Sequence, residues 1–214
     1  MPMILLTSAY LAPVQSYTKL FCCHHVVEER CDHFVKQTYR NRCLIAAESG
    51  PLALSIPIVH GDGLKPCTRD IRISDHGRWR SLHWNAIVSA YENSPFFDYY
   101  ADDFRPFYEK SAPRFLVDFN EALEHTVCNL LEFEPQKTIN DTSYMEPRLN
   151  DPSFIDLRET IRPKVSIDDP HFRPVAYYQV FAQRNGFLPN LSIIDLLFNM
   201  GPEARLVLRQ SFRE

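Results

Sequence analysis

The stretch MILLTSAYLAPVQSYTKLFCC, residues 3–23, decides the fold class that this sequence predicts. Its first part, Met3–Ser8, is a short apolar run typical of a buried strand. After it, PVQSYTKLFCC is typical of a helix, because Pro13 is well placed in a first helical turn. A strand that leads directly into a helix predicts a fold that mixes helices and strands.

Further strands are predicted in the residues that follow. HVVEER, 25–30, is a short strand candidate, and QTYRNRCLIA, 37–46, alternates its side chains between two faces. The turn ESGP joins this run to LALSIPIV, 52–59, which favours a β-hairpin with Pro57 at an edge or a bulge. RDIRIS, 69–74, alternates as another strand.

Helices are predicted between and after these strands. The stretch 74–95 is helical until Asn93, Ser94 and Pro95 end it, and a second helix lies within 106–133, where Pro113 divides or begins it. KTINDTS, 137–143, is predicted as a strand, and 146–175 is predicted as a long loop. Two short helices are predicted at the end of the chain, with a helix stop at Gly201. We therefore expect an α+β fold in one domain, 1–214, with a mixed part (1–100) and a mainly helical part (101–214) that holds a long loop near 145–175.

Composition narrows the class of protein. The chain has 214 residues, 45% of them hydrophobic, and its formal net charge is −4 with Lys and Arg scattered. These values are typical of a globular domain and argue against a nucleic-acid binder. The apolar runs are too short for a membrane span, and the N-terminus has no basic region of a signal peptide, so we expect a cytoplasmic location and free cysteine thiols.

His83 is the strongest acid/base candidate. In WRSLHWNAIVSAY, 79–91, it shares one helical stripe with Trp79, Ile87 and Tyr91, so it points inward. A buried histidine is most often a packing residue with hydrogen-bond partners. If it lines a cleft, its imidazole suits general base catalysis near neutral pH.

Other chemistry has weaker signals in the sequence. The run from Cys22 to His33 contains possible thiol and imidazole ligands for a metal ion but no C-x-x-C pair. Cys43 and His83 are a second candidate, a thiolate–imidazole pair for covalent catalysis. Cys43 is also typical of a small buried residue. The Asp pairs at 102–103 and 168–169 are common on solvated loops, and no Gly-rich nucleotide loop or serine elbow is present. We therefore expect no metal site and no cofactor.

Several blocks together resemble the WbqC-like family. They are AYLAPVQSYTKL, QTYRNRC, LALSIPI, WRSLHWNAIVSAYENSPFFDYY, DFNEAL and LSIIDLLFNMGPEA, in the order and spacing of that family over nearly the whole chain. The resemblance implies a cytoplasmic step in O-antigen or surface-polysaccharide biosynthesis, on a nucleotide-activated sugar. One reaction consistent with it is transfer of an acyl or aminoacyl group, such as glycyl, to an amino sugar, with an acyl carrier as a further candidate partner.

The family pattern, together with the residue types, gives a candidate site. His83 would be the base, and Arg42 would hold phosphate, with a surface ion pair as the alternative interpretation of that arginine. The remaining candidates could equally be turn, capping or packing residues. The catalytic set is His83, Asn41 and Tyr91, and the substrate-binding set is Tyr10, Gln37, Arg42, Asp195 and Asn199.

Three hypotheses remain open from the sequence. The first is a cofactor-free transferase with His83 as base, which requires His83 in a pocket beside Arg42 and Asn41. The second is a sugar-nucleotide-binding or assembly protein without catalysis, which tolerates the loss of His83. The third is a small metal-dependent enzyme that uses the Cys/His run.

Overall fold

A strand–helix–strand unit opens the chain. The computed structural model describes residues 2–59, 66–109, 113–148, 151–163 and 168–213. Strand β1 (Met3–Thr7) leads through helix α1 (Val14–Cys22) to strand β2 (Val26–Glu29), which pairs with β1 in parallel, with Ile4 opposite Val26. Pro13 stands at the N-cap of α1. The predicted opening and the short second strand are therefore confirmed.

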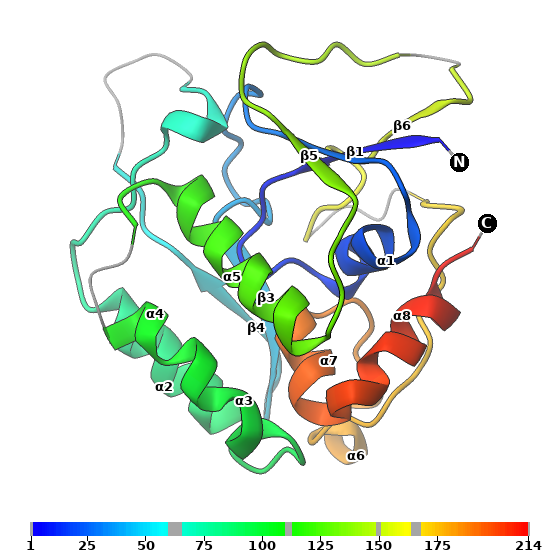
Figure 1. Cartoon of the computed structure of the whole chain (residues 1–214). Helices are drawn as coiled ribbons and strands as arrows, with labels where there is room; N and C mark the ends of the chain where they lie inside the picture. The colour runs from blue at the N-terminus through cyan, green and yellow to red at the C-terminus, as the bar shows by residue number, and fades with distance from the viewer. Residues whose placement is uncertain (1, 60–65, 110–112, 149–150, 164–167, 214) are drawn as a thin grey trace.

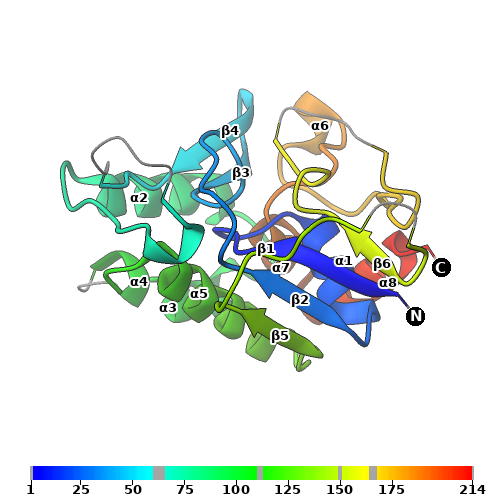
Figure 2. The same ribbon diagram turned by 90° about the horizontal axis from the view of Figure 1, so that it is seen from above.

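A four-stranded parallel sheet extends this unit in the order β5-β2-β1-β6 (Figure 2). β5 (Lys137–Asn140) confirms the strand predicted in KTINDTS. β6 (Phe154–Asp156) lies in the stretch predicted as a long loop, and that prediction was wrong for these residues. Three residues show too little alternation to reveal a strand, and the partner β1 is far away in the sequence.

The predicted β-hairpin is present as a separate antiparallel pair, β3 (Arg42–Ala47) and β4 (Gly50–Ser55). The prediction that the first strand begins at residue 37 was wrong, because residues 37–41 form turns and Gln37 has a φ of 61°. Pro57 follows the end of β4. The strand predicted over 69–74 is absent, since Thr68–Asp70 is a 3-10 turn and Arg72 and Ile73 form only isolated bridges.

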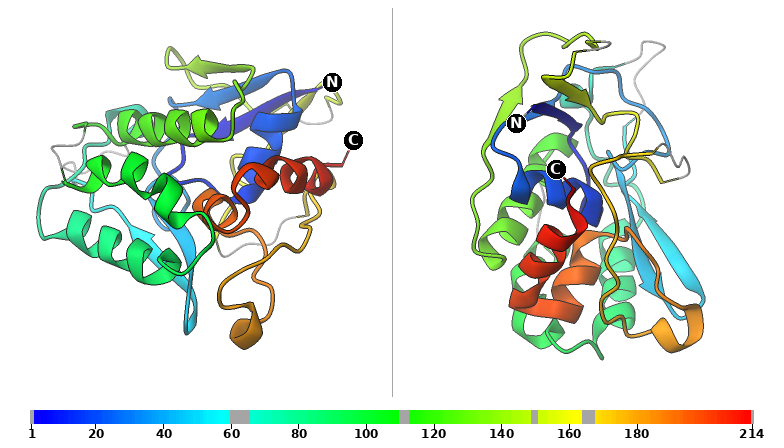
Figure 3. Two further views of the ribbon diagram at one scale, coloured as in Figure 1. Left: turned by 60° about the horizontal axis from the view of Figure 1, so that its bottom comes forward. Right: turned by 90° about the vertical axis from the view of Figure 1, so that its right-hand side faces the viewer.

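Helices pack around the two sheets (Figures 1 and 3). In Figure 1, α5 and α1 lie against the parallel sheet, and α7 and α8 follow beside α1. The helices predicted within 74–95 and 106–133 are confirmed, and Gly201 separates α7 from α8 as the predicted stop. The helix Phe97–Phe104 was not predicted, and the end of the chain holds three helices where two were predicted. The bounds of the helices after α1 are α2 (Trp79–Tyr91), α3 (Phe97–Phe104), α4 (Pro106–Glu109), α5 (Leu116–Leu130), α6 (Ala182–Asn185), α7 (Ile193–Met200) and α8 (Ala204–Ser211).

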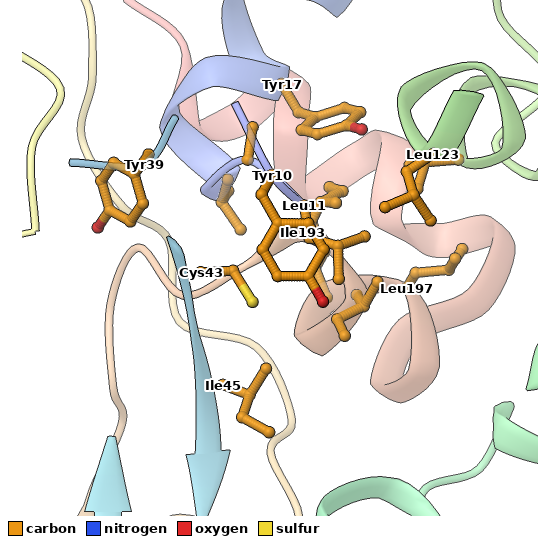
Figure 4. Close-up of a cluster of buried hydrophobic side chains, with 14 of the residues drawn as sticks. Tyr10, Leu11, Tyr17, Tyr39, Cys43, Ile45, Leu123, Ile193 and Leu197 are labelled. Atoms are coloured by element: carbon orange, nitrogen blue, oxygen red, sulfur yellow. The ribbon is translucent and has the colours of Figure 1, made fainter. Parts of the chain in front are cut away.

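One large core joins the sheet, the hairpin and most helices. Its centre contains Tyr10, Cys43, Ile45, Leu123 and Ile193 from widely separated segments (Figure 4). Both the 1–100 and the 101–214 parts contribute to this core. The fold is α+β, as predicted from the sequence. Among the described residues, no helix is long and apolar enough to cross a membrane.

Candidate functional site

The carboxyl edge of the parallel sheet is the natural place for a ligand in this topology. β1 lies between β2 and β6; the chain runs outward on one side from β1 through β2 to β5 and then crosses to β6 on the other side of β1, so the strand order reverses next to β1. In open parallel sheets, ligands bind outside the carboxyl ends of the strands at such a switch point. The segment 30–41 follows the carboxyl end of β2, and a bond from the Tyr10 amide to the Tyr39 carbonyl, 2.9 Å, ties it to the segment after β1.

A surface hollow of about 290 Å³ opens on this segment, and we call it the β2–β3 hollow. Residues 56–58, which directly follow β4, and Phe34 supply its apolar part. Residues between β2 and β3, together with Arg42 at the start of β3, supply its polar part. Its lining is Phe34, Lys36, Gln37, Asn41, Arg42, Ile56, Pro57 and Ile58.

Arg42 and Lys36 are the two cations of the hollow. The Nε atom of Arg42 donates to Ser55 Oγ at 2.8 Å, which leaves its terminal nitrogens for other partners. Among the described residues, no carboxylate forms an ion pair with Arg42 or Lys36. Two cations without a described counter-charge make the hollow suited to an anionic ligand.

Asn41 and Gln37 complete the polar wall. The Asn41 amide donates to the Ile56 carbonyl at 2.8 Å, and the Ile56 amide donates back to the Asn41 carbonyl at 2.8 Å. This exchange fixes the two sides of the hollow. Gln37 holds a φ of 61°, a conformation that is uncommon outside glycine and directs the backbone around the rim. The structure thus brings together three predicted site residues, Gln37, Asn41 and Arg42.

His83 and Tyr10 meet each other in the core. The hydroxyl of Tyr10 lies 3.0 Å from His83 Nδ1 and 2.7 Å from the hydroxyl of Tyr108. Burial lowers the pKa of His83 to about 4, against a backbone hydrogen bond to Ser55 that raises it. The imidazole is therefore neutral at pH 7. His83 does not line the β2–β3 hollow, and these contacts match the packing interpretation.

Tyr91, Asp195 and Asn199 form a second buried group. Tyr91 donates to Asp195 Oδ1 at 3.0 Å, and Tyr177 and Gln179 donate to Oδ2 at 2.7 and 2.8 Å. The Asn199 amide donates to the Asp195 carbonyl at 2.7 Å. Burial raises the pKa of Asp195 to about 6, against the three donated bonds. None of the three predicted residues lines the hollow, and their bonds hold α2, α7 and the segment before α6 together.

Sequence reasoning missed Phe34, Lys36 and Ser55. Lys36 precedes a turn that was predicted as a strand. No sequence pattern therefore indicated that Lys36 lies on the rim of the hollow. Ser55 lies opposite Arg42 in the hairpin. The predicted pairing of the two hairpin strands was the one sequence feature that indicated this contact. Arg40, next to Arg42 in the sequence, is buried and pairs with Asp32 instead.

Cys43 occupies a structural position in the core. Cys43 is fully buried beside Tyr10 (Figure 4), and burial raises the pKa of its thiol. A thiol with a raised pKa is a weak nucleophile at neutral pH. In the described part of the chain, no group of three or more His, Cys, Asp or Glu side chains is arranged to hold a metal ion.

Comparison with known proteins assigns the family. The sequence model of the WbqC-like protein family matches residues 9–165, well over half of the chain. This chain belongs to the WbqC-like protein family. An uncharacterized protein of Mycobacterium tuberculosis (strain ATCC 25618 / H37Rv), Rv1507c, is 24% identical over 195 residues, which cover 82% of this chain and 84% of that protein. No solved structure gives a significant match.

The WbqC-like match covers the hollow and the buried histidine alike. Residues 9–165 include Tyr10, every residue of the β2–β3 hollow, and His83. Asp195 and Asn199 lie outside the matched residues. The part of the chain that carries the family signal therefore includes Lys36 and Arg42, for which the described residues supply no ion-pair partner.

Proposed function

We propose that this WbqC-like protein binds a nucleotide-activated amino sugar in the β2–β3 hollow and transfers an acyl or aminoacyl group, such as glycyl, to the sugar amine. This reaction would be a cytoplasmic step in making O-antigen or another surface polysaccharide. The binding part of the proposal rests on the hollow, and the transfer part rests on the resemblance to the family.

The observation that carries the proposal is the pair Lys36 and Arg42 on one rim without a described carboxylate partner. A sugar nucleotide carries two linked phosphates, and an arginine with free terminal nitrogens binds such oxygens in a bidentate way. Lys36 adds a second, more mobile charge. The position at the carboxyl edge of the parallel sheet supports the same conclusion.

The remaining lining suits the rest of a sugar nucleotide. Phe34 supplies an aromatic surface for a base or a sugar ring, and Ile56 and Ile58 supply apolar contact. Gln37 is exposed at the rim, where its amide can recognise hydroxyl or carbonyl groups. The hollow is small for a whole nucleotide sugar, so we expect the diphosphate to occupy it and the two ends of the ligand to extend beyond it.

The transfer step needs a proton acceptor. A bond forms between the sugar nitrogen and the acyl carbon, the bond from that carbon to its leaving group breaks, and the amine gives up a proton. His83 is the sequence-predicted base, and its role stays a prediction. A neutral ring can accept a proton, but the Nδ1 atom already contacts the Tyr10 hydroxyl.

A binding protein without catalysis is the second candidate function. The specific observation that favours it is that His83 is buried and does not belong to the lining of the hollow. The third hypothesis, a metal-dependent enzyme, has no such support in the described part of the chain.

Two experiments separate these functions. A thermal-shift series with pyrophosphate, UDP, UDP-glucosamine and UDP-N-acetylglucosamine tests binding, since a ligand at 100 times its Kd stabilises by about 2.7 kcal/mol. Mass spectrometry after incubation of UDP-glucosamine with acyl-CoA or aminoacyl donors tests transfer. Binding with an acylated product supports the transferase, binding without any product supports the binding protein, and no shift with any phosphate ligand contradicts both.

A further inference from the structure

The two cations of the β2–β3 hollow are held by different parts of the fold. Arg42 begins β3, where the ladder to β4 and the bond to Ser55 Oγ at 2.8 Å fix it. Lys36 lies outside both sheets, on a turn in which Gln37 has a φ of 61°. Segments outside a ladder are more mobile than strands. An ordered position for Lys36 therefore depends on side-chain bonds within its own segment.

The hydroxyl of Thr38 provides the first of these bonds. Its Oγ1 atom donates to the Val35 carbonyl at 2.7 Å, so the bond spans Lys36 and Gln37, which lie between the two residues. Bonds of this kind, from a threonine hydroxyl to a nearby carbonyl, stabilise turns. Thr38 is buried, whereas Lys36 and Gln37 are exposed. We call residues 35–38 the rim turn, because its two central residues line the hollow.

Arg40 holds the Thr38 hydroxyl from the buried side. Its side chain is 2% exposed, and its Nη1 atom donates to Thr38 Oγ1 at 3.3 Å while Nη2 pairs with Asp32 Oδ2. The planar fork of a guanidinium bonds two groups in a fixed relative position. Because the Thr38 oxygen accepts from Arg40, the hydroxyl proton is directed to the Val35 carbonyl.

Both ends of the Arg40 contact are anchored elsewhere in the fold. Asp32 Oδ1 accepts the Thr68 hydroxyl at 2.5 Å, and the Asp32 carbonyl accepts the Thr68 amide at 2.8 Å. The Arg40 carbonyl accepts the side-chain amide of Asn120 on α5 at 2.9 Å. A buried charge is costly without its partner, so Arg40 and Asp32 stay together. The guanidinium therefore offers Thr38 a fixed contact.

We propose that Arg40 is a positioning residue, which holds the rim turn in place through the hydroxyl of Thr38 and so fixes Lys36 at the rim of the hollow. The anion that Lys36 then meets rests on the proposed function, whereas the order of the rim turn does not. A loop that becomes ordered only on binding lowers the affinity by the cost of ordering it. Arg40 removes that cost from the core, although it does not line the hollow.

Backbone ¹⁵N relaxation tests the order of the rim turn without any ligand. In the natural chain we expect amide order parameters for Lys36 and Gln37 of about 0.85, the value of rigid backbone. Thr38→Val keeps the shape of the side chain and removes the hydroxyl, so we expect the order parameters to fall toward about 0.6. Thr38→Ser retains the hydroxyl and should preserve them. Unchanged order parameters in Thr38→Val overturn the proposal.

Thr18→Val is the matched control. Thr18 is fully buried on α1, and its Oγ1 atom also donates to the carbonyl three residues earlier, that of Gln15, at 2.7 Å. We expect this variant to leave the order parameters of the rim turn unchanged. Equal loosening of the rim turn in Thr18→Val and Thr38→Val would mean that both act on the fold in general, which overturns the proposal.

A double variant tests Arg40 itself. Asp32→Asn combined with Arg40→Gln removes both charges together, so no buried charge is left alone. We expect this chain to lose order in the rim turn, as Thr38→Val does. Should it not fold, Arg40→Lys takes its place, because an ammonium lacks the planar fork. A rim turn that stays ordered in the folded variant overturns the proposal.

Titration with inorganic pyrophosphate then connects position to binding. We expect Thr38→Val to weaken pyrophosphate binding several-fold in the natural chain and to have no further effect in a Lys36→Ala background. An equal loss in both backgrounds would mean that Thr38 does not act through Lys36, which overturns the proposal. If the natural chain does not bind pyrophosphate, the proposed function fails, and the order parameters still decide the role of Arg40.

Discussion

The Tyr91 hydroxyl donates to Asp195 Oδ1 at 3.0 Å across a sequence separation of 104 residues. The same hydroxyl accepts the Ala46 amide at 3.2 Å, so one oxygen links α2, α7 and β3. Both partners are buried, Asp195 completely. The hydroxyl therefore satisfies one buried acceptor and one buried donor at the same time.

Tyr91→Phe is expected to lower the free energy of unfolding by about 1–3 kcal/mol, because it leaves buried polar groups without a partner. Urea denaturation measures the change. Tyr99→Phe is the matched control, since Tyr99 is 75% exposed and should be nearly silent. Equal stability of the two variants would contradict the linking role of Tyr91.

Asp195 should make stability fall as pH rises. Its pKa is raised to about 6 by burial, above the value of about 3.9 for an unfolded aspartate. Between these values the native state binds more protons than the unfolded state, so the stabilising contribution is present at low pH and is lost as pH rises through the native pKa. The difference in free energy of unfolding between the natural chain and Asp195→Asn should therefore decrease from about pH 4 to pH 7 and then level off. Urea denaturation across this range measures it, and a difference that grows with pH would refute the assignment.

Gly201→Ala is expected to be more destabilising than Gly77→Ala. Both glycines have positive φ, 54° and 77°, so either substitution carries backbone strain. A Cβ atom at Gly201 would also lie 2.5 Å from the Phe96 ring, whereas nothing lies within 4 Å of one at Gly77. Thermal unfolding of the two variants gives the comparison. A smaller loss for Gly201→Ala would mean that the Phe96 ring moves away freely.

The strands and helices with a strong local pattern could be predicted from the sequence. The apolar run before Pro13 and the alternation in LALSIPIV identified the opening and the hairpin. β6 could not be predicted, because its three residues are a strand only through pairing with β1. Residues 37–41 alternate like a strand, yet Gln37 turns the chain, a tertiary effect that overrides local alternation.

The candidate site was predictable only in part. The RNR block pointed to Asn41 and Arg42, and the hollow brings both together with Gln37. The helical stripe showed that His83 faces inward, and its burial confirms this orientation. Whether an inward histidine reaches a cleft depends on which loops cover it, and helical periodicity carries no information on that point. The contact between His83 and Tyr10 required the tertiary structure.

The central claim is that Arg42 binds a phosphate-bearing ligand, and calorimetric titration with pyrophosphate tests it most directly. We would compare the natural chain with Arg42→Ala and with Arg205→Ala, a control on α8 outside the hollow. Loss of a charge-assisted contact worth about 1.5–3 kcal/mol predicts a Kd at least about tenfold higher for Arg42→Ala, and an unchanged Kd for Arg205→Ala. The same Kd in all three proteins would contradict the account.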